Sequence, residues 1–264
     1  MQFSIIGTGF IFPSHVEAIR HVGGKIRDIV NTARGEEIWR EMVKTTDADC
    51  IVILTPNDLH FEMVNAASEA GKIVLCEKPL SLKSEELKTL VNKKNIFTVL
   101  QLKYHPLIKE IKEEMRNNSY YEIEIDISVY RDEKYYQSWK GQKERSGGIL
   151  FNLGIHYFDL LIYLFGVPNI IERTLCAEKT ASGLLKGENY SCSWRLSTDE
   201  KRGSQKRAFK INGADYNFSS QDNLSHENLH REIYRDLLVG RGAKPEDALD
   251  ATVLTEKIYK SIPA

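Results

Sequence analysis

Residues 3–24, FSIIGTGFIFPSHVEAIRHVGG, decide how the first half of the chain folds. The apolar run Phe3–Ile6 predicts a β-strand, Gly7 and Gly9 predict a tight turn, and the residues after them predict a helix. This order is typical of a dinucleotide-binding unit, in which the first glycine makes the turn and the second lets the backbone approach a pyrophosphate. Phe12 stands where that fingerprint has its third small residue, and an ordinary β–α turn also fits the pattern.

Apolar runs and helical patterns alternate through the first hundred residues. Further strands are expected at 26–30, 50–54, 73–76 and 97–102, each separated from the next by a helix. Continuous apolar runs suit strands that are buried on both faces, and the alternation predicts an α/β Rossmann domain with a doubly wound parallel sheet.

Ligands of such sheets bind at the carboxyl ends of the strands. An acidic residue is expected after the second strand when the cofactor is NAD, but Asn31 stands there and Arg34 follows, which favours NADP slightly. Arg34 could equally be a solvated loop charge. The residues expected to bind the cofactor are Gly7, Gly9, Phe10, Ile11, Asn31, Thr32, Arg34, Thr55, Pro56, Asn57, His60, Glu77, Lys78 and Gln101.

The pattern changes to period two in the second half. Residues 121–129 alternate apolar and polar, which predicts a sheet with one dry and one wet face. The prediction is an α+β domain with an open, mostly antiparallel sheet over residues 103–264, following a Rossmann domain over 1–102. Its further strands are expected at 170–179, 190–196 and 207–218, and its last helices at 228–239 and 245–261.

The most apolar stretch, 146–166, begins with a glycine pair and ends at a glycine, as a buried helix would. Asn152, His156 and Asp159 interrupt it at helical spacing and predict one polar stripe. A His beside an Asp can serve as an acid–base pair or as a structural ion pair, and this helix alone does not decide between them.

The amino-acid composition limits which kinds of function are expected. The 264 residues carry a net charge of −1, which offers no basic excess for nucleic acid. The four cysteines form no CxxC pair and are expected to be reduced, with no metal site. Without a charged leader or a long uninterrupted apolar run, the chain is expected to be cytoplasmic, with no membrane partner.

The motifs together resemble the Gfo/Idh/MocA oxidoreductases, two-domain NAD(P)-dependent dehydrogenases of sugars and cyclitols. The matching segments are GTGFI at the start, TPNDLH at 55–60, AGKIVLCEKPL at 70–80, LQLKYHP at 100–106 and GGILFNLGIHYFDLL at 147–161.

The resemblance implies roles for particular residues. Lys78 of the EKP segment and His156 are expected to meet at the nicotinamide, with Asp159 supporting His156. His156 would be the base, Lys78 would donate to the reacting oxygen, and Pro79 would fix the turn with an unusual peptide geometry. The resemblance also implies a homodimer or homotetramer packed through the second sheet.

A closer similarity is to UDP-N-acetylglucosaminuronate (UDP-2-acetamido-2-deoxyglucuronate) 3-dehydrogenases, carried by LQLKYHP, SWKG at 138–141, WRLS at 194–197 and LLVGRGAKPEDA at 237–248. It implies hydride transfer between the cofactor and the 3-hydroxyl of a nucleotide sugar, with Trp139 as an aromatic wall and Lys140 as a cation near the acid group. The residues expected to bind the substrate are Lys78, Lys103, Tyr104, His105, Trp139, Lys140, Asn152 and His156.

Two alternatives stay open. The chain could be a dehydrogenase of a free sugar or cyclitol, or a non-catalytic dinucleotide-binding sensor on the same fold.

The chain also departs from the family pattern: it is short between Asn31 and Cys50, and it has Phe12 and Asn31 in place of the expected residues. These departures put the choice between NAD and NADP, and the tightness of binding, in doubt.

Overall fold

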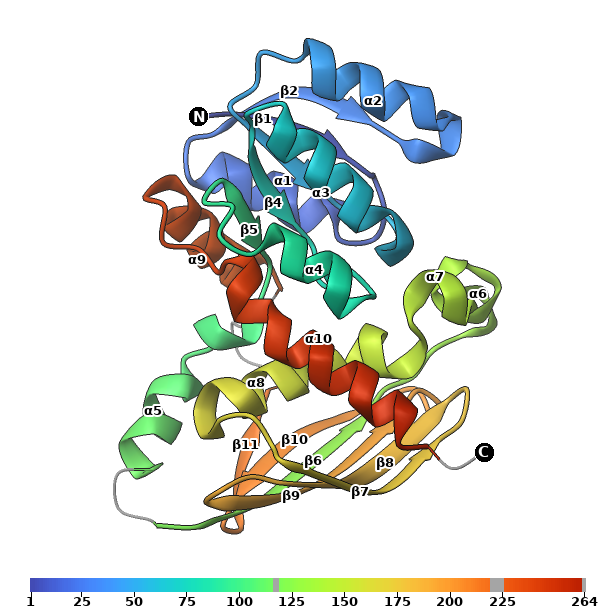
Figure 1. The fold of residues 1–264 in the computed structure, drawn as a ribbon, viewed down its shortest axis with the longest axis vertical. Helices are drawn as coiled ribbons and strands as arrows, with labels where there is room; N and C mark the ends of the chain where they lie inside the picture. Colours follow the sequence, from blue (N-terminus) through green and yellow to red (C-terminus); the bar gives the residue numbers. More distant parts are fainter. Residues whose placement is uncertain (116–118, 219–225, 263–264) are drawn as a thin grey trace. The chain divides into compact units, whose positions relative to one another are not determined.

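The computed structural model describes residues 1–115, 119–218 and 226–262, without the side chains of residues 34, 36, 226 and 227. The chain, drawn in Figure 1, divides into two compact units. Unit 1 comprises Met1–Tyr104 and Ser220–Leu249, and unit 2 comprises His105–Ser219 and Asp250–Ala264.

Unit 1 contains a five-stranded sheet in the order β2-β1-β3-β4-β5, and every neighbouring pair is parallel. This confirms the predicted doubly wound sheet. The order reverses direction between β1 and β3, which is where ligands of such sheets bind. The strands are β1 (Gln2–Ile6), β2 (Lys25–Val30), β3 (Cys50–Ile53), β4 (Ile73–Cys76) and β5 (Ile96–Thr98).

Helices cover both faces of this sheet. Side chains of α2, α3 and α4 pack with alternate strand residues on one face, whereas α1 and α9 pack on the other. The helices are α1 (Phe12–His21), α2 (Glu36–Thr45), α3 (His60–Glu69), α4 (Ser84–Leu90) and α9 (His226–Leu238).

Helix α9 makes the units differ from the predicted contiguous domains. The change of unit near Tyr104 lies close to the expected boundary at Leu102, but the chain later returns to unit 1. Ile233, Tyr234 and Leu237 of α9 join the core that contains Phe3 and Leu75. Because a buried parallel sheet needs both faces covered, α9 supplies apolar cover beside α1 that the first hundred residues lack.

Unit 2 contains a six-stranded sheet in the order β11-β10-β6-β9-β8-β7. The central pair β6–β9 is parallel and the other pairs are antiparallel, so the sheet is mostly antiparallel as predicted. Its strands are β6 (Tyr121–Ser128), β7 (Ile170–Cys176), β8 (Thr180–Lys186), β9 (Tyr190–Ser197), β10 (Lys206–Ile211) and β11 (Ala214–Asn217). Its helices are α5 (Leu107–Glu114), α6 (Glu133–Gln137), α7 (Lys143–Ser146), α8 (Ile155–Phe165) and the part of α10 (Pro245–Lys260) that follows Leu249.

The two faces of this sheet have different chemistry. On the inner face Phe158 of α8 meets Trp194 edge to face, with ring centroids 5.3 Å apart. On the outer face Asp126 pairs with Lys206 at 2.8 Å and with Arg195 at 3.2 Å. One dry and one wet face were expected, and the structure confirms both.

Among the described residues, one helical run, Lys143–Phe165, has the length and composition of a membrane span, but 56% of its most apolar window is buried within the structure. A core helix passes the same test, so no membrane span is inferred. All four cysteines are free thiols. Burial raises the pKa of the thiols of Cys50, Cys76 and Cys192, which makes them unreactive.

Candidate active site

The glycine turn after β1 has the form that a bound pyrophosphate needs. Gly7 has φ +102°, and a Cβ built there would lie 2.6 Å from the carbonyl oxygen of Leu54, so only glycine fits between β1 and β3. A Cβ built at Gly9 would meet nothing within 4 Å. Gly7 thus packs directly against the protein, whereas the space beside Gly9 is open and leaves room for a ligand.

Helix α1 begins directly after this turn. Its N-cap residue, Ile11, supplies no side-chain cap, and Phe10 is 83% exposed. The amide of Phe12 donates to the carbonyl oxygen of Gly9 at 3.1 Å, that of Ser14 donates to Ile11 at 3.1 Å, and Pro13 has no amide hydrogen. The attraction of this helix start for an anion therefore rests on the helix dipole. Gly7, Gly9 and the start of α1 therefore fit the pyrophosphate of a dinucleotide.

Asn31 holds the end of β2 to the glycine turn. Its Nδ2 donates to Thr8 Oγ1 at 2.6 Å, and its Oδ1 accepts from the amide of Ala33 at 2.9 Å. Thr32 begins the 3₁₀ turn that follows. The side chain of Arg34 lies outside the described residues, so its expected role stays a prediction.

The ends of β3 and β5 add polar groups to the same edge of the sheet. Thr55 and Asn57 are 5% exposed, and Pro56 lies between them. Gln101 is 8% exposed, and its Oε1 has no hydrogen-bond partner within the described part of the chain. A buried acceptor without a donor is costly unless a ligand supplies one, and this favours the expected contact of Gln101 with a cofactor.

His60 has a place different from the one expected. Its side chain is fully buried, with Nδ1 2.6 Å from the carbonyl oxygen of Pro79 and Nε2 2.9 Å from that of Thr55. A buried ring held between two backbone carbonyls does not reach a ligand. His60 instead joins the turn after β3 to the turn after β4.

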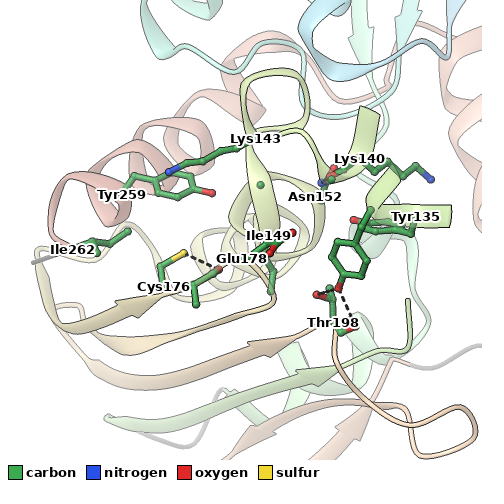
Figure 2. A pocket seen from close by; sticks show the side chains of 14 residues that line it. Tyr135, Lys140, Lys143, Ile149, Asn152, Cys176, Glu178, Thr198, Tyr259 and Ile262 are labelled. Atoms are coloured by element: carbon green, nitrogen blue, oxygen red, sulfur yellow. Dashed lines mark hydrogen bonds between the residues drawn. The ribbon is translucent and has the colours of Figure 1, made fainter. Parts of the chain in front are cut away.

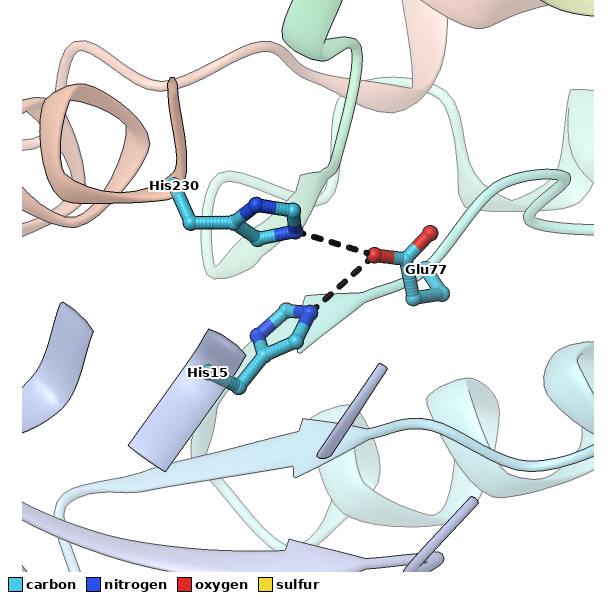
Figure 3. A group of neighbouring side chains, drawn as sticks. All are labelled: His15, Glu77 and His230. Carbon is cyan, nitrogen blue, oxygen red and sulfur yellow. Dashed lines mark hydrogen bonds and ion pairs between the residues drawn. The ribbon is translucent and has the colours of Figure 1, made fainter. Parts of the chain in front are cut away.

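The turn after β4 carries Lys78. The Lys78–Pro79 peptide is cis, as the expected unusual geometry required. Glu77 lies beside two fully buried histidines, with Oε1 3.0 Å from His15 Nε2 and 3.4 Å from His230 Nε2 (Figure 3). His15 Nδ1 lies 2.9 Å from the hydroxyl of Tyr234.

Burial lowers the pKa of His15 to about 4, although the hydrogen bond to Glu77 works in the other direction. Burial alone would raise the pKa of Glu77, but the hydrogen bonds from His15 and His230 outweigh it and hold that pKa well below its usual range. The cluster is therefore an anionic carboxylate between two histidines, of which His15 is neutral at physiological pH.

The sequence patterns do not predict this cluster of three residues. His15 and His230 lie 215 positions apart, and His230 belongs to a helix that was assigned to the other domain. The one available signal was that His15 precedes Ala18 and Ile19 on the apolar face of α1. The ligand-type atoms of His15, Glu77 and His230 lie within 4.8 Å of one another, so these residues could also hold a metal ion.

In unit 2, the polar residues of the 146–166 stretch lie on two kinds of helix. Residues Leu150–Gly154 form a π-helical turn, and α8 begins only at Ile155. The wider π turn interrupts the predicted stripe at Asn152, whose Nδ2 donates to the carbonyl oxygen of Lys140 at 3.1 Å. His156 is half-buried and Asp159 is 3% exposed on α8. Such π turns occur often at functional sites.

A pocket of about 370 Å³ opens beside this turn (Figure 2). Lys140 lies on its wall next to Asn152, and its Nζ lies 5.7 Å from the ring centre of Tyr135 and 5.8 Å from that of Trp139. Burial, and then the charge of Arg131, lower the pKa of Lys140. The lining residues are Tyr135, Tyr136, Lys140, Gly141, Lys143, Gly148, Ile149, Asn152, Cys176, Ala177, Glu178, Thr198, Tyr259 and Ile262.

The three expected substrate residues near 104 belong to two units. Lys103 and Tyr104 belong to unit 1, where burial and then the charge of Asp236 raise the pKa of Tyr104. His105 belongs to unit 2 and is 3% exposed. Its Nδ1 accepts from the amide of Leu107 at 3.3 Å, so Nε2 carries the proton, and that atom has no partner among the described residues.

Unit 1 thus gathers Gly7, Gly9, Asn31, Thr55 and the Lys78 turn at one edge of a parallel sheet. Unit 2 gathers Lys140 and Asn152 at one pocket. The first set of residues defines a dinucleotide-binding protein of the Rossmann class.

Comparison with known proteins identifies the family. Residues 1–96 match the oxidoreductase family with an NAD-binding Rossmann fold (GFO_IDH_MocA), and residues 116–203 match the C-terminal alpha/beta domain of the same family. The chain therefore belongs to the Gfo/Idh/MocA family, and its first domain is an NAD-binding domain.

Curated relatives align over part of their length. Levoglucosan dehydrogenase of Pseudarthrobacter phenanthrenivorans is 33% identical over 148 residues, which cover 52% of this chain and 38% of that protein. The scyllo-inositol 2-dehydrogenase (NADP(+)) IolW of Bacillus subtilis is 26% identical over 170 residues, which cover 57% and 47%. The chain spans less than half of the length of these two relatives.

Solved structures match over the whole chain. The WlbA (WbpB) dehydrogenase from Thermus thermophilus, in complex with NAD and UDP-GlcNAcA, has a TM-score of 0.87 at 27% identity, covering 100% of this chain and 95% of that one. The same dehydrogenase in complex with NAD and alpha-ketoglutarate also has a TM-score of 0.87, with 97% of its chain covered.

Proposed function

We propose that this protein is an NAD(P)-dependent dehydrogenase that transfers a hydride between a nicotinamide cofactor and a secondary hydroxyl of a sugar, the 3-hydroxyl of UDP-N-acetylglucosaminuronic acid. The observation that carries the proposal is the likeness, over the whole chain, to a dehydrogenase whose structure contains NAD and UDP-GlcNAcA. The presence of Lys78 and His156 supports it further, because a non-catalytic sensor would not need both residues.

The cofactor, when bound, accepts the hydride from the carbon that carries the hydroxyl. In this proposal His156 takes the proton of that hydroxyl, and Asp159 orients the imidazole and stabilises its charged form. Lys78 donates to the oxygen and stabilises the negative charge that develops as the proton leaves. Loss of one hydride and one proton converts the alcohol to a ketone.

The groups expected around the sugar have matching chemistry. Lys140 lies at the pocket beside the π turn, near the ring of Tyr135, and would face the acid group. Trp139 does not line that pocket, so its expected role as an aromatic wall rests on the family resemblance. The buried Nε2–H of His105 would donate to a substrate oxygen, which would satisfy a donor that has no partner within the described residues.

The preference for NAD or NADP depends on Arg34, which has no acidic neighbour at Asn31. We expect NADP to be accepted, and Arg34→Ala should weaken NADP binding at least tenfold relative to NAD, about 1.4 kcal/mol. Dissociation constants for both cofactors measure this. If NAD binds more than tenfold tighter than NADP to both proteins, Arg34 has no such role.

Analysis of the products tests the substrate. Purified protein with NAD and UDP-N-acetylglucosaminuronate should form NADH and a 3-keto sugar that mass spectrometry detects, whereas free N-acetylglucosaminuronate and myo-inositol should react at least a hundredfold more slowly. Faster turnover of a free sugar or cyclitol would favour that alternative. The nucleotide released from denatured protein would identify a retained cofactor.

Four free cysteines, three of them buried, support the proposed cytoplasmic location.

A further inference from the structure

The Lys78 turn is held by histidines from three helices, all of them within unit 1. His15 of α1 and His230 of α9 both lie at Glu77 Oε1, at 3.0 Å and 3.4 Å. His60, at the start of α3, lies 2.6 Å from the carbonyl oxygen of Pro79. Residues on both sides of Lys78 are thus fixed by side chains that are fully buried.

The other oxygen of Glu77 reaches Lys78 itself. Glu77 Oε2 accepts the backbone amide of Lys78 at 3.2 Å, and the Glu77 amide donates to the carbonyl oxygen of Ile53 at 3.0 Å. The carboxylate therefore connects two buried imidazoles on one side to the Lys78 backbone on the other. A rotation of this carboxylate would release the Lys78 amide.

The alternation of side chains along β4 and the periodicity of α1 and α9 explain why these residues meet. Leu75 packs on the face of the sheet that α1 and α9 cover, and Glu77 follows two residues later, so it continues on that side. His15 precedes Ala18 and Ile19 on the buried face of α1, and His230 precedes Ile233 and Tyr234 on that of α9. Both histidines therefore point from helix faces that pack on the sheet.

The proton positions are consistent with a complete hydrogen-bond network. Tyr234 donates its hydroxyl proton to His15 Nδ1, which leaves the proton of the neutral ring on Nε2 to donate to Glu77. His230 Nε2 donates to the same carboxylate oxygen. Hydrogen bonds to a buried carboxylate are charge-assisted and therefore hold its orientation strongly.

We propose that His15 and His230 are positioning residues for Lys78: they orient the Glu77 carboxylate, which fixes the backbone from which the Lys78 side chain extends. This inference rests on the proposed function of Lys78 in the reaction. Neither histidine touches the reacting atoms. Misplacing a catalytic group by about 1 Å can cost on the order of 10²-fold in rate.

Amide hydrogen exchange tests the first half of the proposal without any substrate. In His15→Leu and His230→Leu, the Lys78 amide should exchange at least tenfold faster than in wild type, measured by mass spectrometry on overlapping peptides around residues 77–83. Thr46→Ala is the matched control, because Thr46 makes a buried hydrogen-bond cluster with Ser4 and Asp28 in the same unit, away from this turn. It should leave exchange at Lys78 unchanged.

Turnover of UDP-N-acetylglucosaminuronate tests the second half. Both leucine variants should lose at least tenfold in kcat, and any rise in KM for NAD should be no larger than the rise that Lys78→Ala causes. His15→Gln and His230→Gln keep an amide donor near the Nε2 position and should recover most of that loss. Thr46→Ala should lower the melting temperature as much as the leucine variants do, and yet keep the wild-type kcat.

Three results would overturn the proposal. Unchanged exchange at Lys78 in both leucine variants would show that the histidines do not hold the turn. Faster exchange with wild-type kcat would show that the turn does not position Lys78 for the reaction. One equivalent of tightly held metal in the purified protein, lost from the His230→Leu variant, would make the cluster a metal site. If wild type fails to oxidise the sugar, the proposed function fails, while the exchange result still decides whether the histidines hold the turn.

Discussion

Gly7 and Gly9 lie two residues apart, yet an added methyl group would meet different surroundings at each. At Gly7 it would lie 2.6 Å from the Leu54 carbonyl oxygen, on a backbone with φ +102°. At Gly9 it would project into open space. One glycine is thus required by the fold, and the other is required only if a ligand approaches it.

This difference predicts opposite outcomes for two substitutions. Gly9→Val should leave the melting temperature within about 2 °C of wild type and weaken NAD binding at least tenfold, because its side chain occupies the space of the pyrophosphate. Gly7→Ala should destabilise the protein by more than about 1 kcal/mol, because the backbone conformation and the contact with Leu54 both resist a Cβ.

Calorimetric titration with NAD and thermal unfolding measure the two effects separately. Wild-type affinity in Gly9→Val would remove the basis for placing the cofactor at this turn. A Gly7→Ala protein as stable as wild type would show that the close approach of β1 to β3 is not required.

Some site residues could be predicted from the sequence, because each lies within a local motif. Gly7, Gly9 and Lys78 follow strands that the apolar runs make plain, and the structure places them at one edge of the sheet. His15 and His230 could not be predicted, because their role depends on which face of two distant helices packs on the sheet. That packing is a property of the tertiary structure.

Three elements, α1, β4 and α9, meet at the buried cluster around Glu77, and their contact should depend on pH. The folded pKa of His15 is about 4, whereas the ordinary value is 6.5. Between these values the unfolded chain binds a proton that the folded protein does not. Protonation of His15 therefore leaves the free energy of unfolding almost unchanged above about pH 6.5 and lowers it as the pH falls from 6.5 toward 4.

Lowering the pH from 7 to 5 should therefore reduce the free energy of unfolding by about 2 kcal/mol, because the unfolded chain binds this proton and the folded protein does not. Glu77 acts in the same direction at lower pH, because its folded pKa is also below the ordinary value. Urea unfolding at the two pH values measures the loss, and His15→Gln should show a loss smaller by about that amount. Equal losses in both proteins would mean that His15 is not the group that resists protonation.

Elements differ in how well the sequence predicts them. The strand Ile73–Cys76 has the predicted bounds, because a continuous apolar run defines it. The predicted strand 97–102 is shorter than expected: β5 covers Ile96–Thr98, and Gln101–Tyr104 form a 3₁₀ helix. Apolar composition alone does not separate the two conformations.

Three features of unit 2 were also predicted wrongly. The strand Thr180–Lys186 was missed, because its glycine and its mixed side chains resemble a loop. The predicted strand 207–218 is a hairpin, interrupted at Asn212 and Gly213, both of which have positive φ. The π-helical turn before α8 was read as α-helix, since both are apolar and continuous in sequence.

The family resemblance implies self-association through the sheet of unit 2. The inner apolar face is covered by α8, and the outer face carries ion pairs such as Asp126–Lys206. The expectation of self-association therefore rests on family resemblance. We predict a dimer or tetramer by light scattering at micromolar concentration.

The oligomeric state should then depend on the salt concentration. If copies meet through the charged face of the sheet, raising the ionic strength should shift the equilibrium toward smaller species, because exposed ion pairs are screened. A monomer mass at low salt would rule out the predicted assembly.

We propose that Lys78 and His156, residues of different units, act on one hydroxyl of one substrate. His156→Ala should lower turnover by about 10²–10⁴-fold, with a smaller loss at high pH, where hydroxide can replace the base. Asp159→Asn should fall between wild type and that variant, because Asp159 only orients and charges the imidazole. Lys78→Ala should impair turnover together with cofactor or substrate binding.

A double-mutant cycle on kcat/KM for UDP-N-acetylglucosaminuronate shows whether the two residues act together. Wild type, His156→Ala, Lys78→Ala and the double variant are compared under the same conditions. Groups that act together in one transition state are strongly non-additive, so the double variant should be little slower than the slower single variant. If the two losses simply multiply, Lys78 and His156 do not share a transition state, and the proposed site is contradicted.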